Sequence, residues 1–194
     1  MSGASPARLT DLARGDLASL RAFLSGRRTR GTSLAAQLDA RLDTERQDTL
    51  LTWAARHGQA EAVRLLLETG ASVGATTGGG RSALLIACQE GHVECVRLLL
   101  EAGAAINQAM NGGSTPLLAA CQEGRLDIAR LLLEAGAAVD QARNNGVTPL
   151  LMACHNGHLE VAKLLSSYGA SRAATPFGAP EEAANSRGHA DLAA

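Results

Sequence analysis

One glycine recurs along this chain at a fixed spacing of 33 residues, and this period constrains the fold more than any other feature. The recurring positions are Gly58, Gly91, Gly124 and Gly157. Each lies between an Ala-rich apolar stretch and a Leu-rich one. A sustained period of this length is typical of stacked supersecondary units, each too small to bury its own apolar face. We therefore expect a solenoid rather than a single globular core.

Each unit carries the sequence signals of two short helices. In the third unit the apolar stretch begins with Thr115 and Pro116, and proline is well tolerated in the first turn of a helix. The stretch ends before Gly124, a residue type that can cap a helix with a positive φ. A Leu-rich stretch follows at helical spacing and ends before Gly136. The Asn-Asn-Gly segment that ends at Gly146 then predicts a tight turn.

This pattern resembles the ankyrin repeat. The residues that carry the resemblance in the fourth unit are Gly146, Thr148-Pro149-Leu150, Ala153, Gly157-His158, Leu164-Leu165 and Gly169-Ala170. The other units follow the same pattern, so the resemblance covers most of the chain. It implies an all-α ankyrin-repeat solenoid, in which helix–turn–helix units are joined by short β-hairpin-like turns.

The units depart from the family pattern at three kinds of position. The family's histidine after Pro-Leu is replaced by Thr52, Leu85, Leu118 and Leu151, which adds apolar packing. The family's turn aspartate is replaced by Thr44, Thr77, Met110 and Arg143. In the first full unit Gln47 stands for the turn glycine and Leu50 for the proline. The geometry of that hairpin is left open, whereas its helices are expected.

We interpret residues 1–194 as a single ankyrin-repeat domain. The full repeats are predicted at 44–76, 77–109, 110–142 and 143–175, with a degenerate N-terminal cap unit at 5–26, a basic insertion at 27–43 and a truncated C-terminal cap unit at 176–194. The insertion contains Arg27, Arg28 and Arg30. Such a charge run is usually solvated, and a role in phosphorylation or nuclear import is the weaker alternative.

Composition and charge exclude several functional classes. The chain is 46% hydrophobic but only 2% aromatic, so burial must come from Leu, Val, Ile and Ala. With a net charge of −1, the chain lacks the excess of Lys and Arg that nucleic-acid binding requires. No apolar run could span a bilayer, and the N-terminus does not resemble a secretory signal. We expect a monomer in the cytoplasm or the nucleus that binds neither nucleic acid nor membrane.

The cysteines and histidines are expected to be structural. Cys88, Cys95, Cys121 and Cys154 are predicted to be buried, reduced thiols, because neighbouring packed helices lie too far apart for a disulfide; an approach of Cys88 to Cys95 is left open. A zinc site at Cys154-His155 and His158 would need further ligands, and none is evident. The glycines at 78–80 lack the Lys-Ser/Thr of a phosphate loop. No metal or cofactor is expected.

No residue departs from the repeat pattern in a way that indicates catalysis. Acid–base or nucleophilic chemistry needs a positioned base beside a reacting group, so we expect no catalytic residue. Asn107 lies where intracellular asparaginyl hydroxylases modify ankyrin families. Ala105 replaces the acidic residue often found two positions before it, which favours an unmodified asparagine.

The resemblance implies that a partner binds to the concave face, which is the surface formed by the hairpin tips and the exposed side of the first helices. These positions vary between units whereas the leucine helices barely change. The candidate residues are Arg46, Asp48, Arg56, His57, Arg81, Gln89, Glu90, Ser114, Gln122, Glu123, Asn144, Asn145, His155 and Asn156. The face lacks aromatic anchors, so we expect Arg56 and Arg81 to contribute most.

The resulting hypothesis is a non-enzymatic protein–protein interaction scaffold. One alternative is a targeting or regulatory ankyrin module of a larger enzyme, such as a kinase or ubiquitin ligase, suggested by the incomplete last unit. A second alternative is an enzyme in its own right, which would need a pocket outside the repeat pattern. The sequence does not specify the partner.

Overall fold

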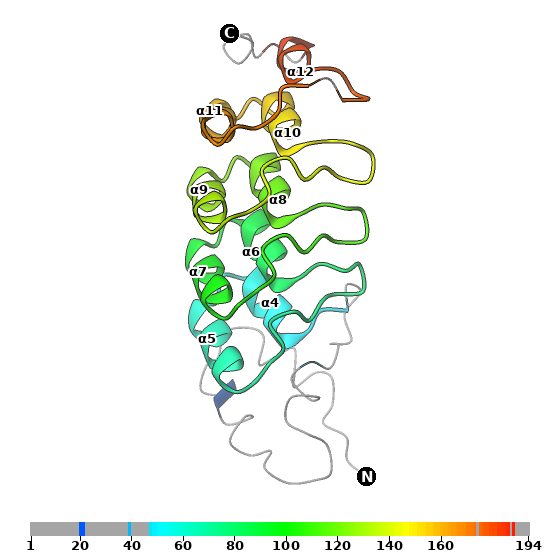
Figure 1. Ribbon diagram of the computed structural model, residues 1–194. Helices are drawn as coiled ribbons and strands as arrows, with labels where there is room; N and C mark the ends of the chain where they lie inside the picture. Colours follow the sequence, from blue (N-terminus) through cyan, green and yellow to red (C-terminus); the bar gives the residue numbers. More distant parts are fainter. Residues whose placement is uncertain (1–19, 22–38, 40–46, 174, 187, 189–194) are drawn as a thin grey trace.

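The structure, a computed structural model, describes residues 20–21, 39, 47–173, 175–186 and 188. Its helices within these ranges are α4 (Leu50–Arg56), α5 (Ala60–Glu68), α6 (Ala83–Glu90), α7 (Val93–Glu101), α8 (Pro116–Gln122), α9 (Leu126–Glu134), α10 (Pro149–His155), α11 (Leu159–Ser167) and α12 (Pro180–Ser186). The first helices of the units stack in one column and the second helices in another, and the hairpins project away from the second helices (Figure 1). The expected all-α repeat solenoid is confirmed.

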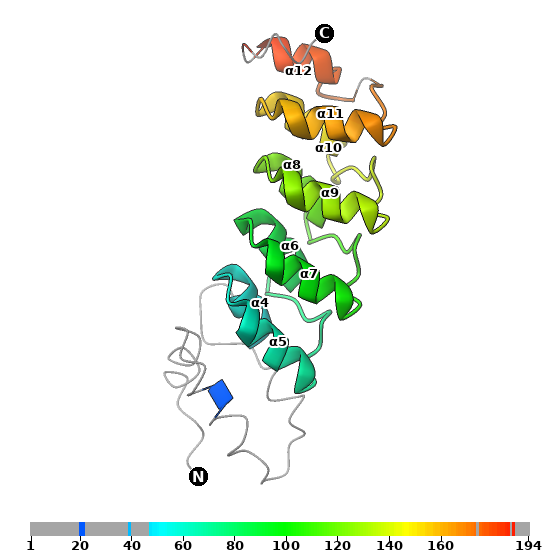
Figure 2. The same cartoon turned by 90° about the vertical axis from the view of Figure 1, so that its left-hand side faces the viewer.

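Figure 2 shows the column of second helices, α5, α7, α9 and α11, lying nearly side by side in front of the first helices. Each unit therefore contacts chiefly the unit before it and the unit after it, as in other solenoids. Helix α12 extends the column of first helices by packing on α10, and it buries Ala183 and Ala184. The N-terminal cap unit and the basic insertion lie outside the described residues, apart from Leu20, Arg21 and Asp39.

A Ser or Thr residue is the N-cap of every first helix from α4 to α10. The side chains of Thr49, Ser82, Thr115 and Thr148 each accept a hydrogen bond of 3.2 Å from the backbone N–H three residues later. This satisfies one of the donors that a helix leaves free at its start. In α4 the hydroxyl of Thr52 also accepts from the Thr49 N–H at 2.8 Å, which completes a capping box.

The hairpins repeat with the same geometry in three units. The N–H of Thr77 donates to the carbonyl of Arg81, that of Met110 to Ser114, and that of Arg143 to Val147, at 2.9–3.0 Å. The glycine at each tip has a positive φ, as Gly146 does at 89°. Gln47 adopts a φ of 52° at the equivalent position. The first unit therefore keeps the left-handed conformation without glycine, which answers the question that the sequence left open.

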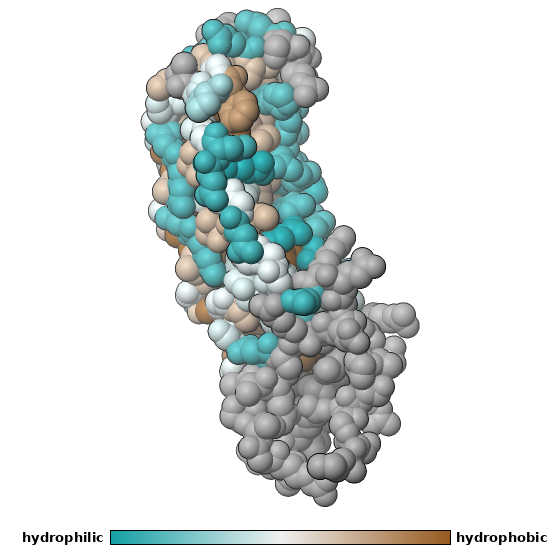
Figure 3. Space-filling view, turned by 90° about the vertical axis from the view of Figure 1, so that its right-hand side faces the viewer, coloured by the Kyte–Doolittle hydropathy of each residue, from teal (hydrophilic) through white to brown (hydrophobic). Residues whose placement is uncertain are grey.

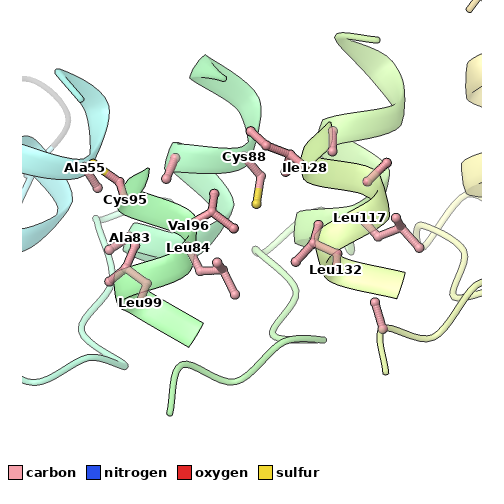
Figure 4. Close-up of a cluster of buried hydrophobic side chains, with 14 of the residues drawn as sticks. Ala55, Ala83, Leu84, Cys88, Cys95, Val96, Leu99, Leu117, Ile128 and Leu132 are labelled. Carbon is pink, nitrogen blue, oxygen red and sulfur yellow. The ribbon is translucent and has the colours of Figure 1, made fainter. Parts of the chain in front are cut away.

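The core is a continuous aliphatic layer between the two helix columns. Leu84, Leu99, Leu117 and Leu132 are at most 1% exposed, and Figure 4 shows them in one layer together with smaller Ala, Cys and Val side chains. Small side chains let helices approach closely, so a core of this kind needs few aromatic rings. All four cysteines are free and buried, as predicted.

Side chains of each unit also hold the backbone of the unit before it. Nε2 of His92 lies 3.0 Å from the carbonyl oxygen of Arg56, and Nε2 of His158 lies 3.0 Å from that of Gln122. Arg125 occupies the same position in the third unit, and its Nε donates to the Gln89 carbonyl at 3.4 Å. Arginine thus replaces histidine here without loss of the contact.

A second set of bonds between units uses short carboxylates and amides. Oδ1 of Asp39 accepts from the Ser72 N–H, and Oδ1 of Asp140 accepts from the Ser171 N–H, each at 2.9 Å. Asn107 belongs to this set, because its Oδ1 accepts from the Ala138 N–H at 2.9 Å. The half-buried Asn107 side chain therefore has a structural role; its hydroxylation state remains a prediction.

Candidate partner-binding surface

The concave face is largely hydrophilic, with a hydrophobic patch near its C-terminal end (Figure 3). Its character in each unit depends on two positions eight residues apart, one at the end of the hairpin and one at the end of the first helix. The successive pairs are Asp48 and Arg56, Arg81 and Gln89, Ser114 and Gln122, and Val147 and His155. Every one of these residues was a predicted site residue except Val147.

In the first full unit this pair is a buried ion pair. Nη2 of Arg56 lies 3.0 Å from Oδ1 of Asp48, and the two side chains are only 9% and 4% exposed. Thr52 donates a further hydrogen bond to Asp48 Oδ1, and Arg56 Nη1 lies 3.7 Å from Glu90 Oε1. Arg56 was expected to be one of the two strongest contributors to partner binding. The structure shows that Asp48 neutralises it within the fold, and its contribution to binding stays a prediction.

In the second and third units the pairs contribute to a cationic pocket of about 250 Å³. Its lining residues are Arg81, Leu85, Gln89, Met110, Ser114, Ala119, Gln122 and Arg143. Arg81 donates to Gln89 Oε1. Arg143 reaches back from the fourth unit and donates to Gln122 Oε1 at 2.6 Å and to Ser114 Oγ at 3.4 Å. Gln89 therefore orients the guanidinium group of Arg81, and Gln122 and Ser114 orient that of Arg143.

Arg143 is the functional candidate that the sequence analysis missed. Burial lowers the pKa of its guanidinium group, and its Nε is buried without a hydrogen-bond partner among the described residues. The available signal was the turn position itself, which holds Thr77, Met110 and Arg143 in successive units. A position that changes so strongly beside constant leucines indicates a surface residue.

The pair in the fourth unit lines an apolar pocket of about 300 Å³ between this unit and the C-terminal cap. Its lining residues are Val147, Leu151, Met152, His155, Phe177 and Ala183. Phe177 is 58% exposed. No aromatic residue was expected on this face from the sequence, and the exposed ring of Phe177 in the pocket lining corrects that expectation.

The remaining predicted residues fall into three groups. His57, Glu90, Glu123, Asn144, Asn145 and Asn156 are exposed, Asp48 and Ser114 are buried, and Arg46 lies outside the described residues. Two of the exposed asparagines also hold the previous unit, because Nδ2 of Asn144 donates to the Asn111 carbonyl at 3.3 Å and Nδ2 of Asn156 to that of Gln122 at 2.8 Å.

His57 packs against Trp53 at a ring-centroid distance of 4.0 Å. Partial burial, and then the charge of Arg56, lower the pKa of His57.

With this geometry in place, the comparisons with known proteins identify the family. The family model described as ankyrin repeats (3 copies) matches residues 13–110 and 104–175. The chain belongs to the ankyrin repeat family. Ankyrin repeats are protein–protein interaction modules and are generally not enzymes. No curated protein matches the chain.

Within the described ranges, no three His, Cys, Asp or Glu side chains lie close enough together to hold a metal ion. None of the helices that the structure describes has the length and apolar character needed to cross a membrane.

Proposed function

We propose that this ankyrin-repeat chain binds a partner protein through its concave face and has no catalytic activity of its own. The observation that carries the proposal is the pocket lined by Arg81 and Arg143, where Gln89 and Gln122 orient the two guanidinium groups. Arginine is among the residues most often found at binding hot spots, where it needs a partly desolvated and well-packed setting. The pocket supplies that setting.

The contrast between the core and the concave face supports this proposal. Equivalent core positions carry Ala55, Cys88, Cys121 and Cys154, all small and buried. The pair positions of the concave face instead change from ionic to cationic to apolar along the chain. A solvated surface also varies, but it does not need a guanidinium that is partly desolvated at a cost in free energy. A protein ligand that contacts the pocket would offset that cost.

The partner is proposed to be a protein rather than a nucleic acid. The net charge of the chain is −1, and phosphate binding depends on many cations that act together. We also propose that the chain acts as a monomer in the cytoplasm or nucleus. The targeting of a larger enzyme would use the same surface and remains an alternative prediction.

Affinity capture from extracts of the cells that express the protein tests the proposal. The test variant combines Arg81→Ala, Gln89→Ala, Gln122→Ala and Arg143→Ala. The control combines Arg97→Ala and Arg130→Ala, two exposed arginines on the second helices, which removes the same number of cations. We expect the test variant to lose partners that the wild type and the control retain, while circular dichroism shows all three folded. Recovery of the same proteins by the test variant would overturn the proposal.

A further inference from the structure

We infer that Arg143 binds an acidic side chain of the partner protein, and that the neutral side chain of Gln122 keeps the positive charge of Arg143 available for it. This inference rests on the proposed function and specifies the chemistry of the partner. It concerns the guanidinium group that the fourth unit contributes to the pocket of about 250 Å³ on the concave face.

The hydrogen bonds of the Arg143 side chain go to neutral groups. Nη2 donates to Gln122 Oε1 at 2.6 Å and to Ser114 Oγ at 3.4 Å. Within the described ranges, the guanidinium group has no other hydrogen-bond acceptor and no ion pair. Glu123 follows Gln122 in the chain, but its Oε1 accepts from Gln122 Nε2 at 2.9 Å. The part of the chain that the structure describes therefore does not neutralise Arg143.

The first full unit shows the opposite arrangement at equivalent repeat positions. There Arg56 is paired with Asp48 at 3.0 Å, and the two side chains are buried. Ser114, which Arg143 contacts, is the repeat equivalent of Asp48 and carries no charge. A carboxylate at that position would offset the desolvation of the guanidinium group within the fold. Its replacement by serine leaves this role to a group from outside the chain.

The position of the guanidinium group favours a carboxylate as that outside group. Burial lowers the pKa of Arg143, and its Nε is buried without an acceptor among the described residues. Because Gln122 and Ser114 occupy Nη2, Nη1 is the nitrogen that remains for a ligand. A carboxylate that accepts from Nη1 would bring a counter-charge to a partly desolvated cation, and such charge-assisted hydrogen bonds are about twice as strong as neutral ones.

The rest of the pocket fits an amino-acid side chain better than a free anion. Leu85, Met110 and Ala119 contribute apolar surface to its lining. The methylene groups of Asp or Glu can pack on that surface while the carboxylate reaches Arg143, and this burial removes apolar area from water. A free inorganic anion has no apolar part to bury. The occupant that matches both features is therefore an acidic side chain of a polypeptide.

A selection from a displayed library of random peptides against the immobilised full chain tests the inference. We expect the enriched peptides to share an Asp or Glu. Replacing that acid by its amide in a selected peptide should weaken binding at least about tenfold, as measured by calorimetric titration. Arg143→Gln in the protein should weaken binding of the same peptide similarly, and the two changes together should cost little more than either alone.

Gln122→Glu tests the role of the neutral glutamine without removing the arginine. The new carboxylate would pair with Arg143 within the fold, as Asp48 does with Arg56. The acidic peptide should then bind at least about tenfold more weakly, whereas its amide version should bind as it does to the wild type. Arg97→Gln, at an exposed arginine of α7, changes the net charge by the same amount and should leave both affinities unchanged. Circular dichroism checks that every variant is folded.

Several outcomes overturn the inference while leaving the proposed function standing. These outcomes are selection of no peptide, selection of peptides without an acid, and selection of acidic peptides whose affinity Arg143→Gln or Gln122→Glu leaves unchanged. An equal loss of affinity in Arg97→Gln would also overturn it, because it would indicate unspecific charge attraction. The proposed function fails separately, when cellular partners are captured equally by the concave-face test variant and the wild type.

Discussion

His158 of the fourth unit covers Gly124 of the third so closely that a Cβ atom on Gly124 would lie 2.6 Å from the imidazole Nδ1. The imidazole cannot move aside freely, because its Nε2 interacts with the Gln122 carbonyl at 3.0 Å. Gly124 also has a φ of 66°. Two separate physical demands, a left-handed backbone and a close approach, therefore explain the glycine period in the sequence.

Gly124→Ala is expected to lower the free energy of unfolding by about 2–3 kcal/mol, the sum of left-handed strain and the clash with His158. Gly136→Ala is the matched control, since Gly136 has a φ of 88° and a Cβ there would meet nothing within 4 Å. It should cost only about 1 kcal/mol. Urea denaturation measures both. An equal cost for the two variants would contradict this explanation. So would a cost for Gly124→Ala that is not reduced to about 1 kcal/mol, the strain alone, in the His158→Ala background.

Gly74→Asn is expected to stabilise the protein by about 0.5–1 kcal/mol. Gly74 is the repeat equivalent of Asn107 and Asp140, whose side chains accept backbone hydrogen bonds from the next unit. A Cβ at Gly74 meets nothing within 4 Å, so the asparagine has room to form the missing bond. Gly79→Asn, at a glycine in the hairpin tip, controls for backbone entropy. Thermal unfolding measures both variants. If the Tm of the control is equal to or above that of Gly74→Asn, the proposed hydrogen bond does not form.

Alkaline pH is expected to destabilise the fold through the buried thiols. Burial raises the pKa of Cys95 and of Cys154 from 9.0 to about 11, and it also raises the pKa values of Cys88 and Cys121. The unfolded chain releases these protons first, so stability is complete below about pH 9 and falls as pH rises toward about 11.

The dependence on these thiols can be tested with alanine, because Ala55 already occupies their repeat position in the first unit. A variant that combines Cys88→Ala, Cys121→Ala and Cys154→Ala should lose less stability than the wild type between pH 9 and pH 11. Urea unfolding midpoints measured across this range show how steeply the stability of the wild type and of the variant falls with pH. If both fall equally steeply, other groups cause the loss of stability at alkaline pH.

Asp48→Ala is expected to lower the free energy of unfolding by about 2–3 kcal/mol, because it leaves the guanidinium of Arg56 buried without its closest counter-charge. Glu90, 3.7 Å from Arg56 Nη1, compensates only in part. The double variant Asp48→Ala with Arg56→Met removes both charges and should be more stable than Asp48→Ala alone. A double-mutant cycle in urea measures the coupling, and additive costs would show that the pair does not contribute as a unit.

The repeat units and their helices could be predicted from sequence because they depend on local signals. The N-caps Thr115 and Thr148, the prolines after them and the glycines that follow the helices act within a few residues along the chain. The buried thiols were also predictable, since a position that recurs with the period must face the same neighbours in every unit. The hairpin at Gln47 was not, because its left-handed backbone contradicts the residue's own preference.

The sequence by itself determined the stack of units. Each unit repeats the same local signals for helix starts and ends, and it needs only its neighbours to bury its leucines. Only the tertiary structure decided where each charge of the concave face lies and which side chains surround it. Arg56 looks like Arg81 in the sequence, yet the first is neutralised by Asp48 and the second lines a pocket with Arg143, 62 residues away. That distinction depends on how consecutive units stack, and the burial of a charge beside its partner is a property of the assembled solenoid.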